Sequence, residues 1–465
     1  MAGRFLSLFK PISRYLPVIS PPKRKVRFTE KIFWTAIVLI LYLIMCEIPL
    51  YGVAGGGWEL AYMRVIFASR RGTLMELGIG PIVTAGLILQ LLVGANMIEC
   101  DMTDPEDRAL FTSASKAFSI IFTGIQASAY IIGGVYGRLD MITSMIVFLQ
   151  LVAAGVVIIL LDELVQKGWG IGSGVSLFIL AGVAQQIFNQ CFFPTGGIFP
   201  AIISALASGE PLAPLFVRQG PSIIGFIATI VVFFIIIYLE GIRVEIPIAH
   251  AMYRGYRGRY PIKLLYVSNL PVIFASALFA NVYFFSQLLW NSYGNSPNPT
   301  VKFFVSLLGT YSTGERGQLI PSGGLVYYVT SPRWLGDVAA DPLRAFGYTA
   351  ILVIFCVVFS VTWLEVGGLG PSTVAKQLVD SGMQIPGYRR SARPIESLLK
   401  RYIPPVAVLG GIIVGLIAAF ADFLGVFGSG MGILLSVGII YQYYQAIVQE
   451  RAADMYPALR RFLGK

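Results

Sequence analysis

The feature that most constrains this chain is the stretch Leu160 to Ile179, LLDELVQKGWGIGSGVSLFI. It places a short charged turn and several glycines between two long apolar segments. Residues 141–161 and 168–209 on its two sides contain no charged side chain, and such runs are too long for an ordinary soluble core. The sequence therefore predicts a chain that leaves a lipid bilayer at this turn and then re-enters it.

The composition agrees with a chain that folds in lipid. Apolar residues make up 56% of the 465 positions and charged residues only 13%, with a mean hydropathy of +0.74. A spanning helix needs about 20 apolar residues, because the hydrocarbon layer is about 30 Å thick. We therefore predict an all-α membrane protein with ten transmembrane helices, at residues 32–50, 74–98, 117–137, 141–161, 171–190, 222–239, 264–290, 345–364, 403–421 and 423–448.

The distribution of basic residues predicts the orientation of these helices. Ten crossings place both termini on the same side of the membrane. The N-terminal segment, the loops after helices 2, 4, 6 and 8, and the C-terminal tail together hold 26 of the 35 lysines and arginines. Because basic residues are enriched in cytoplasmic loops, we predict that both termini are cytoplasmic.

The ten helices divide into two halves of five, which would have opposite orientations and form an inverted repeat. Proline followed by two branched apolar residues occurs in both halves, at Pro81 and Pro271. Gly411 and Gly415 have the spacing of glycines that let two helices approach closely. The predicted domains are an amphipathic cytoplasmic segment (1–31), a first half (32–207), a hinge loop (208–221), a second half (222–449) and a cytoplasmic tail (450–465).

Motifs of enzymes and metal sites are missing from the sequence. It contains neither GxxxxGK[ST] nor HExxH, and the glycines Gly170, Gly172 and Gly174 follow a membrane helix rather than a strand. The single histidine, His250, lies in a basic loop, and no two of the four cysteines form a CxxC pair. We predict a protein that is not an enzyme, with no catalytic residue, metal or cofactor, driven by its partners or by a gradient.

Charged residues are also rare within the predicted spans, where Glu47 and Glu76 lie near helix ends. Transporters that couple to ions keep buried charges for that function. The pattern favours a passive conduit with neutral walls, and an ion-coupled secondary transporter of small solutes is the alternative. The external segment 55–71 begins with three glycines and is either a surface loop or a short helix folded back into a cavity.

Several long blocks carry a family resemblance. LLDELVQKGWGIGSGVSLFI, the block from Ala68 to Pro81 and the block from Tyr260 to Pro271 closely resemble SecY, the channel-forming alpha subunit of the Sec protein translocon. The resemblance covers nearly the whole chain and is to the archaeal and eukaryotic branch, most of all to archaeal members. It implies a clamshell of two five-helix halves, through which unfolded polypeptides cross the membrane and membrane proteins enter lipid by a lateral gate.

The resemblance also implies four groups of functional residues. An apolar pore ring would consist of Ile79, Val83, Val175, Ile179, Ile273 and Leu435. A polar cluster in the lateral gate, between helices 2–3 and 7–8, would consist of Thr84, Gln126 and Asn269. A plug at about 55–71 would include Trp58, Glu59, Tyr62, Arg64, Val65 and Ile66. Docking residues on the cytoplasmic face would be Arg254, Arg257, Arg259, Lys263, Arg389, Arg390, Arg393, Lys400 and Arg401.

Other interpretations of these residues exist without the resemblance. The ring residues would be ordinary core or lipid-facing side chains, and Gln126 an isolated polar residue that stabilises its own helix. The basic loops would reflect topology and contact with lipid headgroups.

The resemblance implies several partners and a location. The partners are SecE-type (gamma) and beta small membrane subunits, a translating ribosome with its RNA, signal sequences and nascent polypeptides, and membrane lipid. The location is the plasma membrane, with the endoplasmic reticulum membrane as the alternative.

Overall fold

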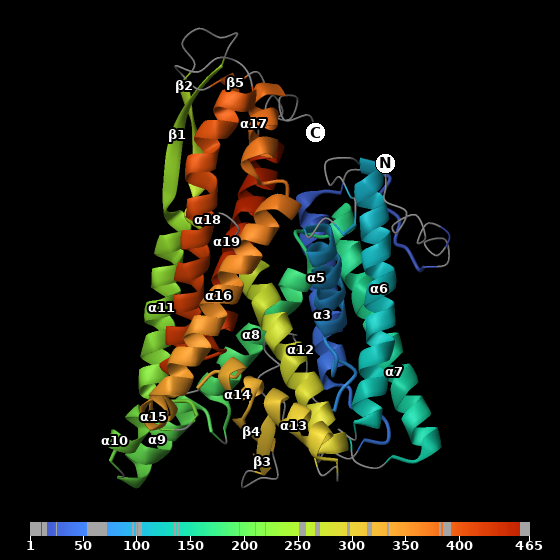
Figure 1. The fold of residues 1–465 in the computed structure, drawn as a ribbon, viewed down its shortest axis with the longest axis vertical. Helices are drawn as coiled ribbons and strands as arrows, with labels where there is room; N and C mark the ends of the chain where they lie inside the picture. The colour runs from blue at the N-terminus through green and yellow to red at the C-terminus, as the bar shows by residue number, and fades with distance from the viewer. Residues whose placement is uncertain are drawn as a thin grey trace.

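The computed structural model describes residues 11, 16–24, 26–53, 72–94, 97–98, 100, 105–133, 136, 139–194, 196–209, 211–218, 220–250, 257–265, 270–294, 298–313, 319–332, 334–380, 383–384 and 392–455. Each of the ten predicted spans corresponds to one helix, and these helices run along the long axis of the molecule (Figure 1). They are α3 (Phe28–Glu47), α5 (Gly80–Gly94), α6 (Pro105–Ile132), α7 (Met141–Leu164), α8 (Gly174–Phe192), α11 (Ile223–Gly241), α12 (Leu270–Tyr293), α16 (Pro342–Val366), α18 (Ala392–Phe423) and α19 (Gly430–Met455).

Some helix bounds differ from the prediction. Helix α5 begins at Gly80 rather than at 74, because residues 72–79 form turns in which Gly72 and Gly78 have positive φ. Helices α6 and α18 begin about three turns before the predicted starts, since a hydropathy window detects only the apolar part of a helix that continues with polar residues. Helix α19 begins at Gly430 rather than at 423.

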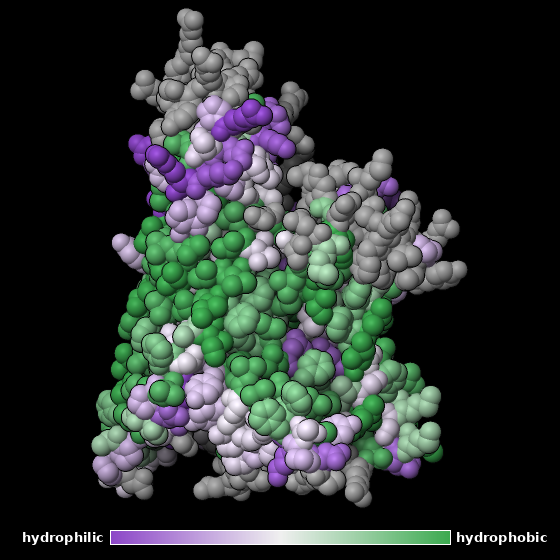
Figure 2. Space-filling model, viewed as in Figure 1, coloured by the Kyte–Doolittle hydropathy of each residue, from purple (hydrophilic) through white to green (hydrophobic). Residues whose placement is uncertain are grey.

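Eight of the described helices are long and apolar enough to cross a membrane by length and composition. The other two predicted spans are α5, which has only 15 residues, and α6, which is 28 residues long but begins with polar and charged residues. Figure 2 shows an apolar band around the middle of the molecule, with polar side chains at both ends. Phe234, Tyr238 and Phe346 are 63%, 74% and 77% exposed, as expected for side chains whose solvent is lipid.

The connections between helices form two groups at opposite ends of the molecule (Figure 1). At one end, β1 (Arg243–His250) pairs antiparallel with both β2 (Arg257–Lys263) and β5 (Met383–Gln384), beside α17 (Pro371–Asp380). These connections follow the sixth and eighth transmembrane helices. The charge distribution predicts that the connections, with their basic residues, lie in the cytoplasm. The two small sheets of the structure were not predicted.

The opposite end holds the connections that follow helices 5 and 7 (Figure 1). Its helix α10 lies within the predicted hinge loop 208–221. The elements of this end are α9 (Ile198–Ser208), α10 (Ala213–Phe216), α13 (Pro299–Leu308), the paired strands β3 (Thr310–Thr313) and β4 (Leu319–Gly323), α14 (Leu325–Val329) and α15 (Leu335–Ala340).

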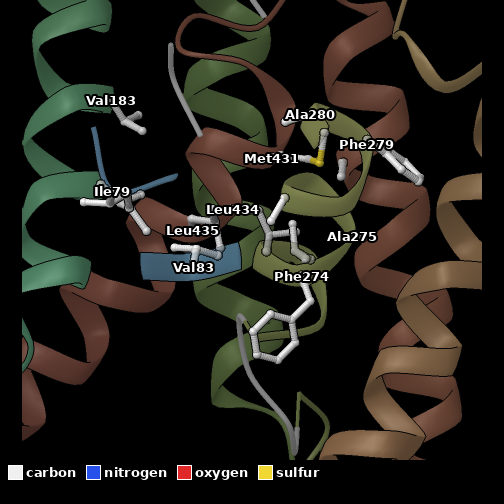
Figure 3. Close-up of a cluster of buried hydrophobic side chains, with 14 of the residues drawn as sticks. Ile79, Val83, Val183, Phe274, Ala275, Phe279, Ala280, Met431, Leu434 and Leu435 are labelled. Atoms are coloured by element: carbon white, nitrogen blue, oxygen red, sulfur yellow. The ribbon is translucent and has the colours of Figure 1, made fainter. Parts of the chain in front are cut away.

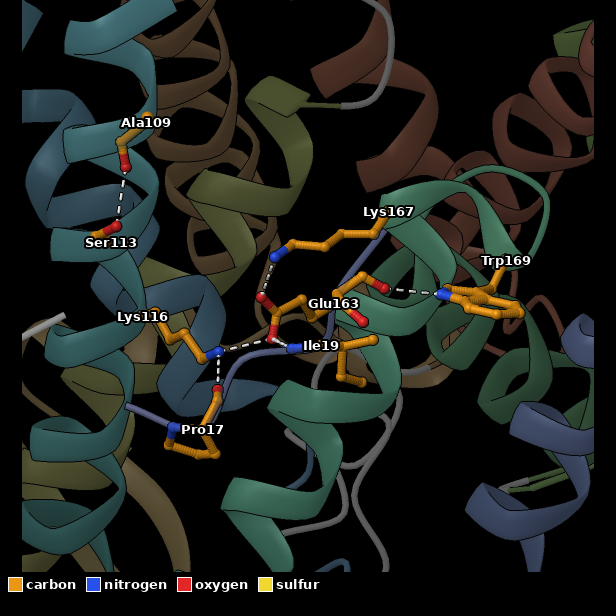
Figure 4. A network of polar contacts seen from close by, with 9 residues as sticks. Pro17, Ile19, Ala109, Ser113, Lys116, Glu163, Lys167 and Trp169 are labelled. Atoms are coloured by element: carbon orange, nitrogen blue, oxygen red, sulfur yellow. Dashed lines mark hydrogen bonds and ion pairs between the residues drawn. The ribbon is translucent and has the colours of Figure 1, made fainter. Parts of the chain in front are cut away.

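A polar network holds residues 17–20 against the ends of two helices (Figure 4). Glu163 at the end of α7 accepts hydrogen bonds from Lys116 of α6 at 2.6 Å and from the backbone N–H of Ile19 at 3.3 Å. Trp169, in the π-helical turn η1 (Val165–Trp169), donates to the carbonyl of Ser20 at 3.0 Å. These contacts join the described part of the N-terminal segment to the first half of the chain.

Helices α16 and α18 pack backbone against backbone, as the spacing of Gly411 and Gly415 predicts. A Cβ at Gly411 would lie 3.1 Å from the Cα of Val357, and a Cβ at Gly415 would lie 3.0 Å from the Cα of Val353. A side chain at either position would be tighter than most Cβ contacts and would push the two backbones apart.

Replacing Gly411 with valine is therefore expected to destabilise the protein by about 1–3 kcal/mol through overpacking. Gly124→Val is the matched control, because no heavy atom lies within 4 Å of a Cβ at Gly124. Thermal unfolding in detergent measures both variants. Equal melting temperatures for the two would contradict the close packing.

Candidate pore and lateral gate

The six predicted ring residues lie in one buried apolar cluster that joins both halves of the chain. Ile79, Ile179 and Leu435 are at most 1% exposed, Val83 is 7% exposed, and Val175 and Ile273 are partly buried against the same cluster. Figure 3 shows Ile79, Val83 and Leu435 beside one another, although they come from distant parts of the sequence.

All six side chains come from the beginnings of four helices. Ile79 directly precedes α5 and Val83 is its fourth residue, and Val175 and Ile179 are the second and sixth residues of α8. Ile273 is the fourth residue of α12 and Leu435 the sixth of α19. The first two turns of these four helices therefore contribute to the same buried cluster, in which α8 contacts α19, and α12 contacts both α5 and α19.

An apolar meeting point of this kind has a simple physical consequence. Ile79, Ile179 and Leu435 offer no donor or acceptor to a water molecule or an ion, and an apolar constriction loses its water column readily. Flexible aliphatic side chains can also move apart around a threaded chain without forming specific hydrogen bonds. The arrangement suits a barrier that excludes ions when no polypeptide is in it and that does not recognise the sequence of a polypeptide passing through it.

The cluster contains further residues that the sequence interpretation missed. Val183 of α8 and Met431 of α19 are fully buried beside the ring (Figure 3), and the hydroxyl of Ser276 on α12 lies 2.9 Å from the sulfur of Met431. Both missed residues are four positions from a ring residue, Ile179 or Leu435, so helical periodicity places them on the same face. That periodicity was the signal by which they could have been found.

The predicted plug residues Trp58, Glu59, Tyr62, Arg64, Val65 and Ile66 lie outside the described residues. The backbone on both sides of that segment is described and forms a closed neck. Leu50 donates to the carbonyl of Gly72 at 2.8 Å, and Leu74 donates to the carbonyl of Ile48 at 3.0 Å. The chain therefore departs and returns at adjacent points, a few residues before Ile79.

A seam between α5 and α6 on one side and α12 and α16 on the other is closed at three levels. Near the end of the molecule that holds α13, β3 and β4, Asn291 donates to the carbonyl of Gly133 at 2.5 Å, and the rings of Tyr130 and Phe284 stack with their centroids 4.8 Å apart. Toward the opposite end, the close approach at Gly94 brings α5 against α16. An apolar groove of about 550 Å³ runs outside the seam, lined by residues of α6, α7 and α12.

The central level of the seam is polar. Asn281 of α12 donates its amide N–H to the hydroxyl of Thr84 on α5, at 3.0 Å. Gln126 is buried on α6, and Asn269 lies outside the described residues. Among the described residues, Thr84 is thus linked across the seam to Asn281, which the sequence interpretation missed because no motif surrounds it.

The predicted docking residues lie around the β1–β2 hairpin and the start of α18. Arg259 is exposed and pairs with Glu245, whereas Lys263 is partly buried, with its ammonium 5.0 Å from the ring centre of Tyr441. Arg393, Lys400 and Arg401 are exposed on α18. Arg254, Arg389 and Arg390 lie outside the described residues, as does the side chain of Arg257.

Comparison with known proteins places this geometry in context. The model of the family SecY matches residues 73–444, and the model of the plug domain of Sec61p matches residues 40–72. A solved structure described as a protein-conducting channel is 40% identical over 97% of this chain and 98% of its own, with a TM-score of 0.83.

Two further solved structures are similar over nearly the whole chain. Sec61 in the canine ribosome–channel complex from the endoplasmic reticulum is 40% identical over 97% of this chain and 98% of its own, with a TM-score of 0.80. The yeast Ssh1 complex bound to the yeast 80S ribosome is 27% identical over 94% of this chain and 93% of its own, with a TM-score of 0.79.

The ring can be tested by adding polar groups to it. Replacing Ile79 and Ile273 together with serine is expected to raise the ionic conductance of the resting protein in a planar bilayer, because hydroxyl groups stabilise water between the helices. Ile158→Ser is the control, since Ile158 is equally buried on α7 but is not a ring residue. A double variant that conducts no more than the original protein would contradict the ring.

Proposed function

This chain belongs to the SecY family of protein-conducting channels, and from that premise we propose that the pore ring is the constriction through which an unfolded polypeptide crosses the membrane. The protein is not an enzyme but a channel with a plug. The observation that supports the proposal is that six apolar side chains from four helix beginnings belong to, or pack against, one buried cluster. The family match favours this function over a secondary transporter of small solutes.

The channel halves are proposed to separate along the seam, with the loop 208–221 as the hinge. Away from the seam, α8 packs against α19, and Gln190 of α8 accepts a hydrogen bond from the N–H of Gly428 at 3.1 Å. At the seam itself, Asn281 donates to Thr84 and Asn291 donates to the carbonyl of Gly133, and each such hydrogen bond between helices is worth about 1 kcal/mol or less within a membrane. The seam is thus held weakly enough to open.

Thr84, Gln126 and Asn269 are therefore proposed as the polar cluster of the lateral gate, and Asn281 is added to it because it donates to Thr84. Signal sequences and apolar segments of a nascent chain would leave through the open seam by partitioning into lipid. The apolar groove outside the seam supports this, because Ile121, Ile125 and Phe285 provide a continuous apolar surface from the seam to the lipid.

Replacing Asn281 with aspartate is expected to make the gate open more readily. An ionised carboxylate within the membrane is unfavourable by about 2.5–3.5 kcal/mol, and opening the seam admits water to it. Asn281→Leu is the matched control, since leucine adds no charge to the closed seam. The measurement is the fraction of a precursor with a weakened signal sequence that reaches the vesicle lumen, and the proposal fails if the aspartate variant is as selective as the original protein.

The basic residues of the cytoplasmic end are proposed to bind phosphates of ribosomal RNA in a translating ribosome. The β1–β2 hairpin, with Arg259, and the start of α18, with Arg393 and Arg401, lie at the same end of the molecule (Figure 1). The similarity to structures of ribosome-bound channels supports this proposal. Lys263 and Lys400 have contacts within the chain, with Tyr441 and Glu396 respectively, and are proposed as minor contributors.

Arg389→Glu combined with Arg390→Glu is expected to weaken ribosome binding and to make its salt dependence less steep, because fewer counterions are released from the RNA. Lys302→Glu is the control, since Lys302 lies on α13 at the opposite end of the molecule. Cosedimentation with ribosomes over a range of salt concentrations measures both effects. Unchanged binding by the double variant would remove these two residues from the docking surface.

The remaining partners are proposed from the family and from the exposed apolar surface. SecE-type and beta subunits would each cover apolar side chains on the outside of the bundle, such as Ile40 and Phe234, and membrane lipid would cover the rest. We propose the plasma membrane as the location, with both termini cytoplasmic. The endoplasmic reticulum membrane is the alternative, and it is where the similar canine channel was found.

A further inference from the structure

We propose that Asp162 and Asp422 are matched positioning residues, which fix the beginnings of α8 and α19 and thereby hold three ring residues in the closed arrangement. This inference depends on the proposed pore ring. Each aspartate lies in or next to the last turn of the fourth helix of its half, and each accepts a hydrogen bond from the first turn of the fifth helix.

In the first half, the carboxylate of Asp162 reaches across the turn between α7 and α8. Its Oδ1 accepts from the backbone N–H of Val175 at 2.9 Å, and its Oδ2 accepts from the side-chain amide of Gln166 at 2.7 Å. Ser173, at the position where a capping side chain is usual, makes no such bond to the helix. Asp162 therefore supplies the cap, and the residue it holds, Val175, belongs to the ring.

In the second half, Asp422 caps α19 together with Ser429, whose hydroxyl accepts from the backbone N–H of Gly432 at 3.1 Å. The Oδ1 of Asp422 accepts from the backbone N–H of Gly430 at 2.6 Å, and its Oδ2 accepts from the hydroxyl of Tyr348 on α16 at 3.0 Å. The ring residue Leu435 follows five positions later on α19. Both aspartates are buried, at 8% and 6% exposure.

The sequence before the two capped helices is the same, Gly-Ser-Gly, at 172–174 and at 428–430. Gly172 and Gly428 have nearly equal φ, +76° and +79°, in the left-handed region that glycine adopts without strain. The second glycine of each triplet lets the chain approach its aspartate. A Cβ at Gly174 would lie 2.6 Å from the Cα of Asp162, and a Cβ at Gly430 would lie 2.9 Å from the backbone nitrogen of Asp422.

The two turns share the aspartate and the conformation of the first glycine, whereas Ser429 has a φ of +66° and Ser173 a φ of −118°. The two fifth helices also contact one another, since the hydroxyl of Tyr443 on α19 donates to the carbonyl of Ser173 at 3.0 Å. A carboxylate at the start of a helix stabilises the partial positive charge of the helix dipole, and it accepts hydrogen bonds from N–H groups that have no partner within the helix. Loss of either aspartate should therefore let the first turn of its helix move, together with Val175 and Ile179 or with Leu435.

The test compares Asp162→Leu and Asp422→Leu with Asp341→Leu in the full-length protein in planar bilayers. Asp341 is a matched control, because it also accepts from a backbone N–H, of Arg344 at 3.2 Å, and from a tyrosine hydroxyl, of Tyr327 at 2.7 Å. The hydrogen bond from Tyr327 lowers the pKa of Asp341, so this control replaces a carboxylate. It lies directly before α16, which carries no ring residue.

Each cap variant is expected to raise the resting conductance about fivefold, the change in a closed–open equilibrium expected from the loss of one helix cap. The Asp341 variant is expected to conduct like the original protein, even if its melting temperature falls. Asp162→Asn and Asp422→Asn keep an acceptor and should fold with an intermediate conductance, so they provide the answer if a leucine variant does not fold.

Unchanged conductance in the folded cap variants would overturn the proposal, and so would an equal leak in Asp341→Leu. The serine variants of Ile79 and Ile273 distinguish a failure of the proposed caps from a failure of the proposed pore ring. If they leak and the cap variants do not, the caps have no role in closure while the ring stands. If neither set leaks, the ring itself is wrong.

Discussion

A helix that begins inside a membrane protein must find partners within the protein for the N–H groups of its first turn. The ring depends on this requirement, because its six residues lie at the beginnings of four helices. Asp162 and Asp422 provide partners for α8 and α19, and the turn before α19 is held further by Thr229, whose hydroxyl accepts from Phe427 at 2.9 Å. The apolar pore ring is therefore positioned by a small number of buried polar groups.

The same arrangement explains how the pore ring can be closed at rest and still open to a polypeptide. On one side of the molecule, α8 and α19 are joined by Tyr443 and Gln190, and they carry ring residues from both halves. On the other side, the seam is closed by the hydrogen bond from Asn281 to Thr84 and by that from Asn291 to the carbonyl of Gly133. The proposed opening at the seam would break these bonds and leave the contacts between α8 and α19 intact. The plug neck, closed at Leu50 and Leu74, lies a few residues from the ring residue Ile79.

Much of this organisation is visible in the sequence, for reasons that are physical. Ten helices follow from apolar runs, and the sides of the membrane follow from the lysines and arginines. The ring residues were found only through resemblance, because an isoleucine in a pore and an isoleucine in a core have the same local sequence. Helix bounds were less certain wherever a helix continues into water, as α6 and α18 do, or begins after a glycine turn, as α5 does.

Other features depend on contacts between distant segments and were not predictable. Asn281 is one polar residue on a long apolar helix, and only the packing of α5 against α12 gives it Thr84 as a partner. Asp162 and its capped helix are separated by a longer turn than Asp422 and its helix, so a search at fixed spacing does not detect the repeat. The Gly-Ser-Gly triplets were present in the sequence, but their meaning required the backbone angles.

The central claim is that the pore ring holds no continuous column of water when no polypeptide is in it. The water permeability of vesicles tests this claim most directly. Proteoliposomes that contain the resting channel would be exposed to an osmotic step, and their shrinkage would be followed by light scattering. The account predicts the same rate as for protein-free vesicles, and a faster rate once a polypeptide is held in the channel without its plug. Rapid shrinkage of vesicles with the resting protein would contradict an apolar seal.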